Sequence, residues 1–130
     1  MIFGLSANPP TGLGGHAGIV NWCATKLRLS FPPRFDPRKD FQNVAVDEVW
    51  VVPVYRHAFS EKSDLLPFEH RMAMSRLAFE TMPGLKRRVH VLDIEKRLYD
   101  DAKTEAVLGS VDLIEKLQTE NPDILFTLAF

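Results

Sequence analysis

The chain has 130 residues, of which 45% are hydrophobic and 25% are charged, and its formal net charge at pH 7 is -1. This length and composition predict one globular domain over residues 1–130 with its own hydrophobic core. The nearly balanced charge gives no electrostatic reason to expect nucleic acid or an acidic membrane as a partner. A single cysteine excludes an internal disulfide, and no apolar run approaches the roughly 18 residues of a membrane span. Since no basic and apolar leader precedes the first apolar segment, we expect a cytoplasmic protein.

The predicted elements begin with a strand, a glycine-rich turn and a helix. Residues 1–7, MIFGLSA, form a short apolar run that two prolines end at residues 9 and 10. From His16 onward, apolar residues recur three and four apart, which predicts a helix that fades near residue 30. Its inward stripe is expected to contain Ile19, Trp22, Cys23, Lys26 and Leu27. Residues 31–43 carry three prolines and several charges, which indicates a surface excursion.

The rest of the chain alternates strands with helices. Residues 47–54 are nearly continuous in β-branched and aromatic residues, as a strand covered on both faces should be, and residues 55–66 indicate a polar loop. Pro67 suits the first turn of a helix that ends before Pro83-Gly84. Its expected inward residues are Phe68, Met72, Ser75, Phe79 and Met82. Further strands are predicted over residues 89–94 and 123–130, and a helix over residues 110–120. This order predicts the α/β class, with a Rossmann-like parallel sheet and flanking helices.

The glycine-rich turn after the first strand is where we expect a ligand. In a parallel sheet, ligands bind beyond the carboxyl ends of the strands. Gly12, Gly14 and Gly15 allow backbone N–H groups to approach a phosphate, and the positive end of the following helix points to the same place. His16 offers an imidazole donor to a phosphate oxygen. In the alternative interpretation, the glycines only make a tight turn and His16 caps the helix. The spacing fits neither the dinucleotide fingerprint nor the P-loop.

Three segments of the chain carry a family resemblance. They read GLSANPPTGLGGH over residues 4–16, VWVVPVYRHAFSEK over residues 49–62, and PFEHRMAMSRLAF over residues 67–79. In this order they resemble the nicotinamide/nicotinate mononucleotide adenylyltransferases, a nucleotidyltransferase family with the opening motif G-[ST]-F-[ND]-P-x-[HT]-x-G-H. Counted from the prolines, Thr11 takes the first His/Thr place of the motif; counted back from His16, Leu13 does, because two extra residues intervene. Together with the segment around residues 110–123, the resemblance spans nearly the full chain.

The resemblance implies an enzyme of NAD biosynthesis that transfers the adenylyl group of ATP to a pyridine mononucleotide. Mg²⁺ would come with ATP, and no protein metal ligand is expected. The resemblance places His16 and Lys62 in catalysis. It places a larger set in nucleotide binding, namely Ser6, Ala7, Asn8, Thr11, Gly14, Gly15 and His57. Two side chains keep structural alternatives: Lys62 as an ordinary solvated lysine, and Arg71 as an anchor of its helix through a nearby carboxylate, which we favour over phosphate contact.

Three questions stay open at this stage. The family's G-x-D loop and I-S-x-[ST]-x-x-R motif are expected beyond Phe130, so the chain is either a catalyst or a shortened relative that binds a nucleotide or a partner without catalysis. The acceptor in the wider superfamily also varies, as in its pantetheine-phosphate and cytidylyl branches, although VPVYRHAF resembles the pyridine branch. Neither the choice between nicotinate and nicotinamide nor the oligomeric state, with a homo-oligomer as one option, follows from the sequence.

Overall fold

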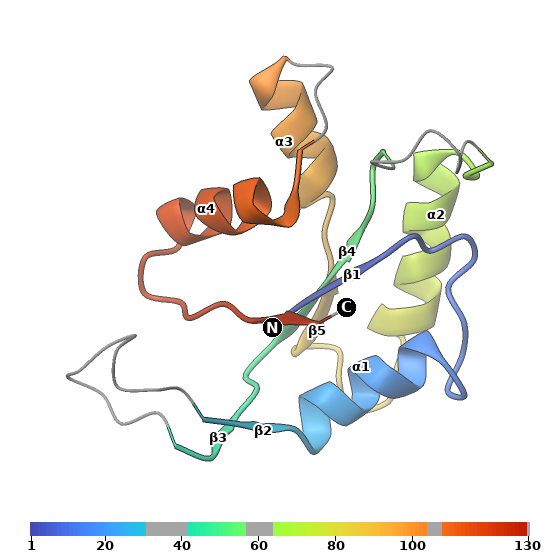
Figure 1. The fold of residues 1–130 in the computed structure, drawn as a ribbon. Coiled ribbons are helices and arrows are strands. Elements are labelled where there is room, and N and C mark those ends of the chain that lie inside the picture. Colours follow the sequence, from blue (N-terminus) through green and yellow to red (C-terminus); the bar gives the residue numbers. More distant parts are fainter. Residues whose placement is uncertain (31–41, 57–63, 104–107, 130) are drawn as a thin grey trace.

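A parallel four-stranded sheet forms the centre of the molecule (Figure 1). The computed structural model describes residues 1–30, 42–56, 64–103 and 108–129. In the sheet order β5-β4-β1-β6, the strands are Val89–Val91, Val49–Pro53, Ile2–Leu5 and Leu128–Ala129. Ile2 pairs with Trp50 on one side and with Leu128 on the other, and Val49 pairs with Val89. The predicted α/β class with a parallel sheet is confirmed.

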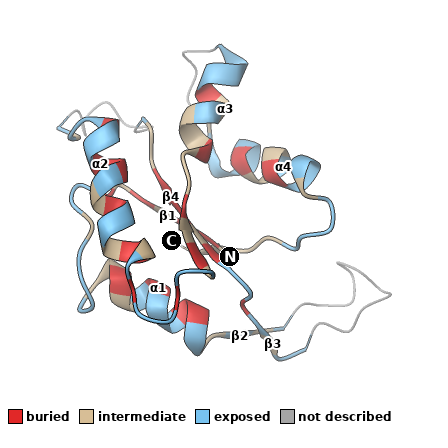
Figure 2. Cartoon of the chain, turned by 180° about the vertical axis from the view of Figure 1, so that it is seen from behind, coloured by how far each residue is buried: buried red, intermediate tan, exposed pale blue. Residues whose placement is uncertain are grey.

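Helices cover both faces of this sheet. One face carries α1 (His16–Thr25) and α2 (Phe68–Ser75), which continues as the π-helix η2 (Arg76–Glu80). The other face carries α3 (Ile94–Ala102) and α4 (Ser110–Glu120) (Figure 1). Successive strand residues point to opposite faces, so Phe3 packs in the core beneath α1 and α2 whereas Ile2 packs beneath α3 and α4. Figure 2 shows the buried residues gathered on the strands and on the helix faces turned toward them.

The predicted inward stripe of the first helix is wrong at three positions, because Ile19, Trp22 and Lys26 are all exposed. Ile19 and Trp22 are 48% and 53% exposed, although Cys23 is buried as expected. The residues of α1 that face the sheet are Ala17, Val20, Cys23 and Ala24. These side chains are spaced three and four apart, and all are smaller than the three exposed ones. We attribute the error to weighting the largest apolar residues, whereas small side chains let a helix lie close to a sheet.

The later helices and strands match the predicted bounds only in part. The α2 helix begins directly after Pro67 and α4 spans residues 110–120, as predicted. The third strand ends at Val91 instead of residue 94, because the chain turns there into α3, a helix that the sequence did not predict. Only two residues of α3 are buried, Ile94 and Tyr99, so its apolar periodicity is sparse. Of the predicted last strand, only Leu128–Ala129 is a strand among the described residues.

A second, two-stranded sheet was also not predicted. β2 (Arg28–Leu29) pairs antiparallel with β3 (Val44–Ala45). Strands of two residues are too short to show alternation in the sequence. Most of the predicted surface excursion, residues 31–41, lies outside the described residues.

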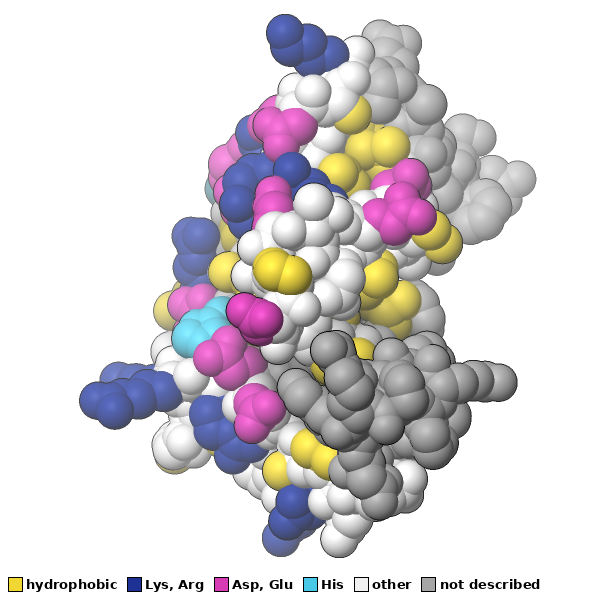
Figure 3. Space-filling view, turned by 90° about the vertical axis from the view of Figure 1, so that its left-hand side faces the viewer, with side chains coloured by type: hydrophobic (Ala, Val, Ile, Leu, Met, Phe, Trp, Pro, Cys, Tyr) yellow, Lys and Arg dark blue, Asp and Glu magenta, His cyan; other side chains and the backbone are white. Residues whose placement is uncertain are grey.

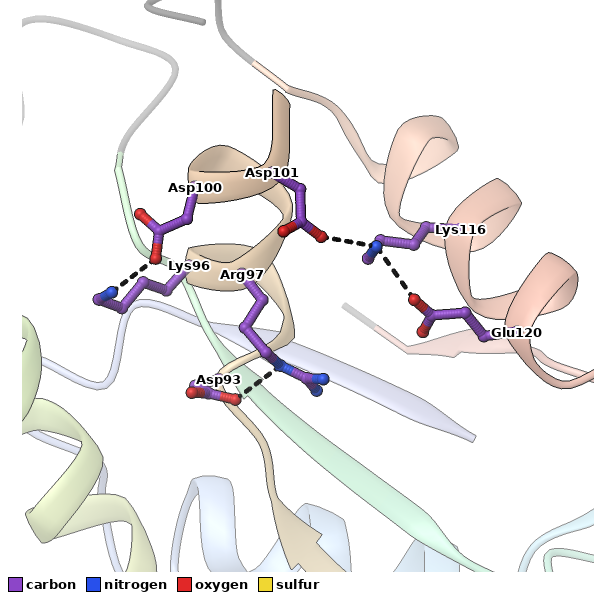
Figure 4. A network of polar contacts seen from close by, with 7 residues as sticks. All are labelled: Asp93, Lys96, Arg97, Asp100, Asp101, Lys116 and Glu120. Atoms are coloured by element: carbon purple, nitrogen blue, oxygen red, sulfur yellow. Dashed lines mark hydrogen bonds and ion pairs between the residues drawn. The ribbon is translucent and has the colours of Figure 1, made fainter. Parts of the chain in front are cut away.

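Ion pairs on the surface join the two helices of the second face. Lys116 of α4 lies 2.9 Å from Asp101 of α3 and 3.0 Å from Glu120 (Figure 4). Figure 3 shows acidic and basic side chains interspersed over this side of the molecule. Such exposed pairs each stabilise a protein by about 0–1 kcal/mol, so apolar burial dominates the packing of these helices. In the described part of the chain, no helix has the length and apolar character needed to cross a bilayer.

The burial pattern of η2 gives a direct test of the fold. Phe79 is fully buried, whereas Leu77, two residues earlier in the same element, is 70% exposed. We expect Phe79→Ala to lower the free energy of unfolding by about 3–5 kcal/mol, because it leaves a cavity in the core. Leu77→Ala, the matched control, is expected to change it by less than about 0.5 kcal/mol. Urea unfolding followed by circular dichroism measures both, and equal losses would contradict the described packing.

Candidate functional site

The order of the strands places the candidate site at the carboxyl end of β1. β4 and then β5 lie on one side of β1, and β6 lies on its other side. The chain therefore reverses its direction of winding at β1, and ligands of open α/β sheets bind in the crevice outside the carboxyl ends of strands at such a switch point. The segment that leaves β1 there, residues 6–15, contains most of the predicted site residues.

Two glycines allow this segment to fold tightly onto the start of α1. A Cβ atom on Gly15 would lie 2.1 Å from Thr11 Oγ1, and one on Gly18 would lie 2.0 Å from the carbonyl oxygen of Leu13. By contrast, a Cβ atom on Gly14 would meet nothing within 4 Å. Close approach therefore requires glycine at positions 15 and 18. Gly18 was not singled out in the sequence, since a lone glycine within a helical pattern gives little signal.

His16 is the first residue of α1, as predicted, and Thr11 fixes its imidazole. The Thr11 backbone N–H donates to His16 Nδ1 at 3.0 Å, and Thr11 Oγ1 lies 3.0 Å from the same nitrogen. A backbone N–H can only donate, so Nδ1 is an acceptor and the neutral ring carries its proton on Nε2. The half-buried ring also packs edge-on against Phe3, with centroids 6.3 Å apart. The imidazole thus has a fixed orientation and a donor at Nε2.

One part of the alternative interpretation, that the histidine side chain caps the helix, is wrong. Thr11 Oγ1 instead accepts the backbone N–H of His16 at 2.9 Å, so the threonine satisfies the first residue of α1. The N-cap residue, Gly15, provides no side-chain cap, and the first turn contains no acidic residue. An anion can therefore approach the positive end of this helix without repulsion from a carboxylate in that turn.

Asn8 acts as a bridge between the segment after β1 and the segment before α2. Its side-chain Nδ2 donates to the carbonyl of Asp64 at 3.1 Å, and its Oδ1 accepts the N–H of Leu66 at 3.0 Å. Both ends of the amide are thus used within the protein. Ala7, just before it, is buried and has a φ of 53°.

Arg71 of α2 is the buried anchor of the site. It is 1% exposed, and its guanidinium donates to four backbone carbonyls. These carbonyls belong to Ser6, Val54, Tyr55 and Leu66, at 3.0, 2.5, 3.4 and 2.8 Å. Burial lowers the pKa of Arg71, which nearby Glu95 and Glu69 oppose. The expected anchoring role agrees with these bonds, although carbonyls and not carboxylates are the partners that the structure describes.

Two predicted site residues, His57 and Lys62, lie outside the described residues. Among the described residues, no group of three or more His, Cys, Asp or Glu side chains is placed to hold a metal ion. A hollow of about 370 Å³ lies at the opposite, amino end of the sheet. It is lined by Leu29, Trp50 and Ile124 and by the carboxylates Asp47, Glu48 and Asp123. Apolar walls and carboxylates do not suit an anionic nucleotide, so the geometry at the carboxyl end is the better candidate.

Comparisons with known proteins agree with the family resemblance in the sequence. No protein-family model matches the chain. It is 39% identical over 83 residues to probable nicotinate-nucleotide adenylyltransferases of Anaeromyxobacter sp. strain K and Anaeromyxobacter dehalogenans strain 2CP-1. The protein of that name in strain 2CP-C is 36% identical over the same length. These matches cover 64% of this chain but only 40% of each relative.

A solved structure has the same fold. The chain is similar to Plasmodium falciparum nicotinic acid mononucleotide adenylyltransferase complexed with NaAD, with a TM-score of 0.68 and 18% sequence identity. The similarity covers 99% of this chain and 49% of that one. The predicted resemblance and the Rossmann-like fold are confirmed, and the chain spans about half the length of this neighbour.

Gly18, in α1, and Gly14, in the turn before it, are predicted to differ in how well they tolerate substitution by alanine. We expect Gly18→Ala to destabilise the fold by roughly 1–3 kcal/mol, since its Cβ would collide with the backbone of Leu13. Gly14→Ala should change stability by less than about 0.5 kcal/mol, because its Cβ enters open space. Thermal unfolding of the two variants measures the difference, and an equally stable Gly18→Ala variant would contradict the close approach.

The Arg71 anchor predicts that lysine cannot replace this arginine. A lysine ammonium cannot reach the four carbonyls that the guanidinium fork joins, so buried acceptors lose partners. We expect Arg71→Lys to lower the free energy of unfolding by about 2–4 kcal/mol. Arg76→Lys, at an exposed position of η2, is the matched control and should be close to neutral. If urea unfolding gave the same stability for both variants, the anchor would be refuted.

Proposed function

We propose that this chain is a nucleotidyltransferase of NAD biosynthesis, which transfers the adenylyl group of ATP to the phosphate of nicotinate or nicotinamide mononucleotide. The observation that carries the proposal is the fixed imidazole of His16, with its Nε2 donor, at the amino end of α1 and the carboxyl edge of the sheet. The similarity to named nicotinate-nucleotide adenylyltransferases supports the choice of reaction. The dinucleotide and pyrophosphate are the products.

The reaction needs alignment and charge stabilisation rather than a covalent intermediate. A phosphate oxygen of the mononucleotide attacks the α-phosphorus of ATP, and the bond from that phosphorus to the bridging oxygen of the β-phosphate breaks. Negative charge grows on the departing pyrophosphate. In this proposal, His16 Nε2–H donates a hydrogen bond to a phosphate oxygen as that charge develops. Thr11 contributes indirectly, because its N–H keeps the imidazole in the tautomer that can donate.

The amino end of α1 would bind the phosphates of ATP. Its dipole favours an anion and its first turn contains no acidic residue, while the N–H groups of His16 and Ala17 already donate to Thr11. Gly14, beside which the structure leaves open space, would allow a phosphate to approach the backbone. Gly15 would shape this approach, and the backbone of residues 6–8 would line the edge occupied by the nucleotide. Lys62 and His57, which follow β4 in the sequence, would contribute further donors.

Mg²⁺ would arrive with ATP and neutralise charge on its phosphates. We further propose that the chain forms one domain and acts in the cytoplasm, where ATP and pyridine mononucleotides are available.

A second candidate follows from the length of the match. Because the matched stretch covers only 40% of the named relatives, this chain is, in the alternative, a nucleotide-binding domain that does not catalyse transfer by itself. ATP binding without dinucleotide formation would distinguish it from an enzyme.

A variant of His16 tests the proposed reaction. Dinucleotide formation from ATP and each mononucleotide is followed by a coupled enzymatic assay, and ATP affinity by calorimetry. We expect His16→Ala to lower kcat about 10²–10³-fold, the loss typical of one preorganised donor to a developing charge. His70→Ala, which removes an exposed histidine of α2, should leave kcat unchanged. Unaltered turnover in the His16 variant would remove this imidazole from the mechanism.

A further inference from the structure

A glutamate on one face of the sheet holds the end of β4. Glu95 lies in the first turn of α3, and its Oε2 accepts the backbone N–H of Tyr55, two residues beyond the end of β4. The backbone N–H of Arg56 also donates to this carboxylate. One side chain therefore receives two consecutive N–H groups, at the point where the chain turns away from the sheet.

Arg71 holds the same place from the opposite face. Its guanidinium donates to the carbonyls of Val54 and Tyr55 and also to the carbonyl of Ser6 at the end of β1. The N–H of Tyr55 is thus bound from α3 and its carbonyl from α2. Arg71 thus joins the carboxyl ends of β1 and β4, and Glu95 holds the end of β4 from the other face.

The side chains of Tyr55 and Arg56 also pack at the carboxyl end of β4. The Tyr55 ring packs edge-on against Phe68, with ring centroids 5.1 Å apart, and at a tilt against Tyr99, with centroids 5.7 Å apart. The Arg56 guanidinium carbon lies 5.4 Å from the centroids of both tyrosine rings. Arg56 is exposed, and none of the described carboxylates forms an ion pair with it. A cation is thereby held over two rings at the edge of the sheet where the proposed nucleotide binds.

Charges around Glu95 explain why the carboxylate can occupy this position. Burial raises the pKa of Glu95, whereas the two N–H groups and the positive charge of Arg71 oppose this rise. Lys96, its neighbour on α3, is engaged with Asp100 at 2.7 Å. The Glu95 carboxylate therefore interacts with the N–H groups at the end of β4 and with the charge of Arg71.

We infer that Glu95 is a positioning residue for ATP binding, which fixes Tyr55 and Arg56 at the carboxyl end of β4, next to the end of β1 from which the segment of the proposed site leaves the sheet. The inference rests on the proposed function. Glu95 itself touches no substrate in this account; it acts through the Tyr55 and Arg56 backbone. A glutamine at position 95 can accept one N–H, but its amide nitrogen would face the other.

The experiment uses the full chain with the variants Glu95→Gln and Glu80→Gln. Glu80 is the matched control, since its Oε1 accepts a single backbone N–H, that of Val91, at 2.8 Å. Amide hydrogen exchange followed by NMR reports the backbone N–H groups that Glu95 and Glu80 accept, and calorimetry reports the affinity for ATP. For Glu95→Gln we expect faster exchange at Tyr55 and Arg56, and a Kd for ATP raised about tenfold, as for one lost charge-assisted hydrogen bond. Glu80→Gln, whose amide oxygen can still accept the one N–H of Val91, should change exchange at Val91 little and change the Kd less than about twofold.

The outcomes separate this inference from the proposed function. A wild-type chain that binds no ATP refutes the proposed function and the inference with it. If the wild type binds ATP and Glu95→Gln binds it equally well, only the positioning role is overturned. An equal loss of affinity in Glu80→Gln would also overturn it, since general loosening would then explain the effect. Should Glu95→Gln fail to fold, Glu95→Asp carries the same expectation, because it keeps the charge but shortens the reach to the two N–H groups.

Discussion

The candidate site depends on the burial of one guanidinium, that of Arg71. Where a parallel strand ends, its last carbonyls lose their partners in the sheet, and leaving them buried without a hydrogen bond costs about 1–3 kcal/mol each. Arg71 gives hydrogen bonds to the carbonyls beyond β1 and β4 together. Arg88 does the same at the other end of the sheet, where it bonds to the carbonyls of Ala24, Val46 and Asp47. Two arginines, Arg71 fully buried and Arg88 half-buried, thus satisfy carbonyl groups where loops and helix ends meet the sheet.

The layers of the fold could be predicted from the sequence because they follow from strong, long patterns. The β-branched run of β4 and the apolar periodicity of α4 are of this kind. Elements with few buried residues were missed: α3 contributes only Ile94 and Tyr99 to the buried set. The exposed position of Trp22 was also missed. Its ring is more apolar than the side chain of Ala17, but only the packing distance between helix and sheet decides which of them fits inside.

The site was predicted in part. His16 at the start of α1 follows from the motif and from the glycines before it, and the structure agrees. The motif left open whether Thr11 or Leu13 corresponds to its first position, and the hydrogen bonds of Thr11 to His16 favour the threonine as the structural partner. The residues between them form the turn in which the N–H of Gly15 reaches the carbonyl of Gly12 at 2.9 Å. The bonds of Arg71 and Glu95 could not be predicted, because their partners are backbone atoms, which leave no signature in the sequence.

The π-helical turn affects how this chain can be compared with its relatives. In a π-helix each hydrogen bond spans one residue more than in an α-helix. The η2 turn therefore accommodates extra sequence without breaking the helix that begins with α2. Here it allows Phe79 to enter the core while the next residue, Glu80, reaches the N–H of Val91 at 2.8 Å. A relative that lacks this bulge would be out of phase after Ser75. An alignment without a gap would then pair inward positions of one protein with outward positions of the other, and low identity there would reflect register rather than divergence.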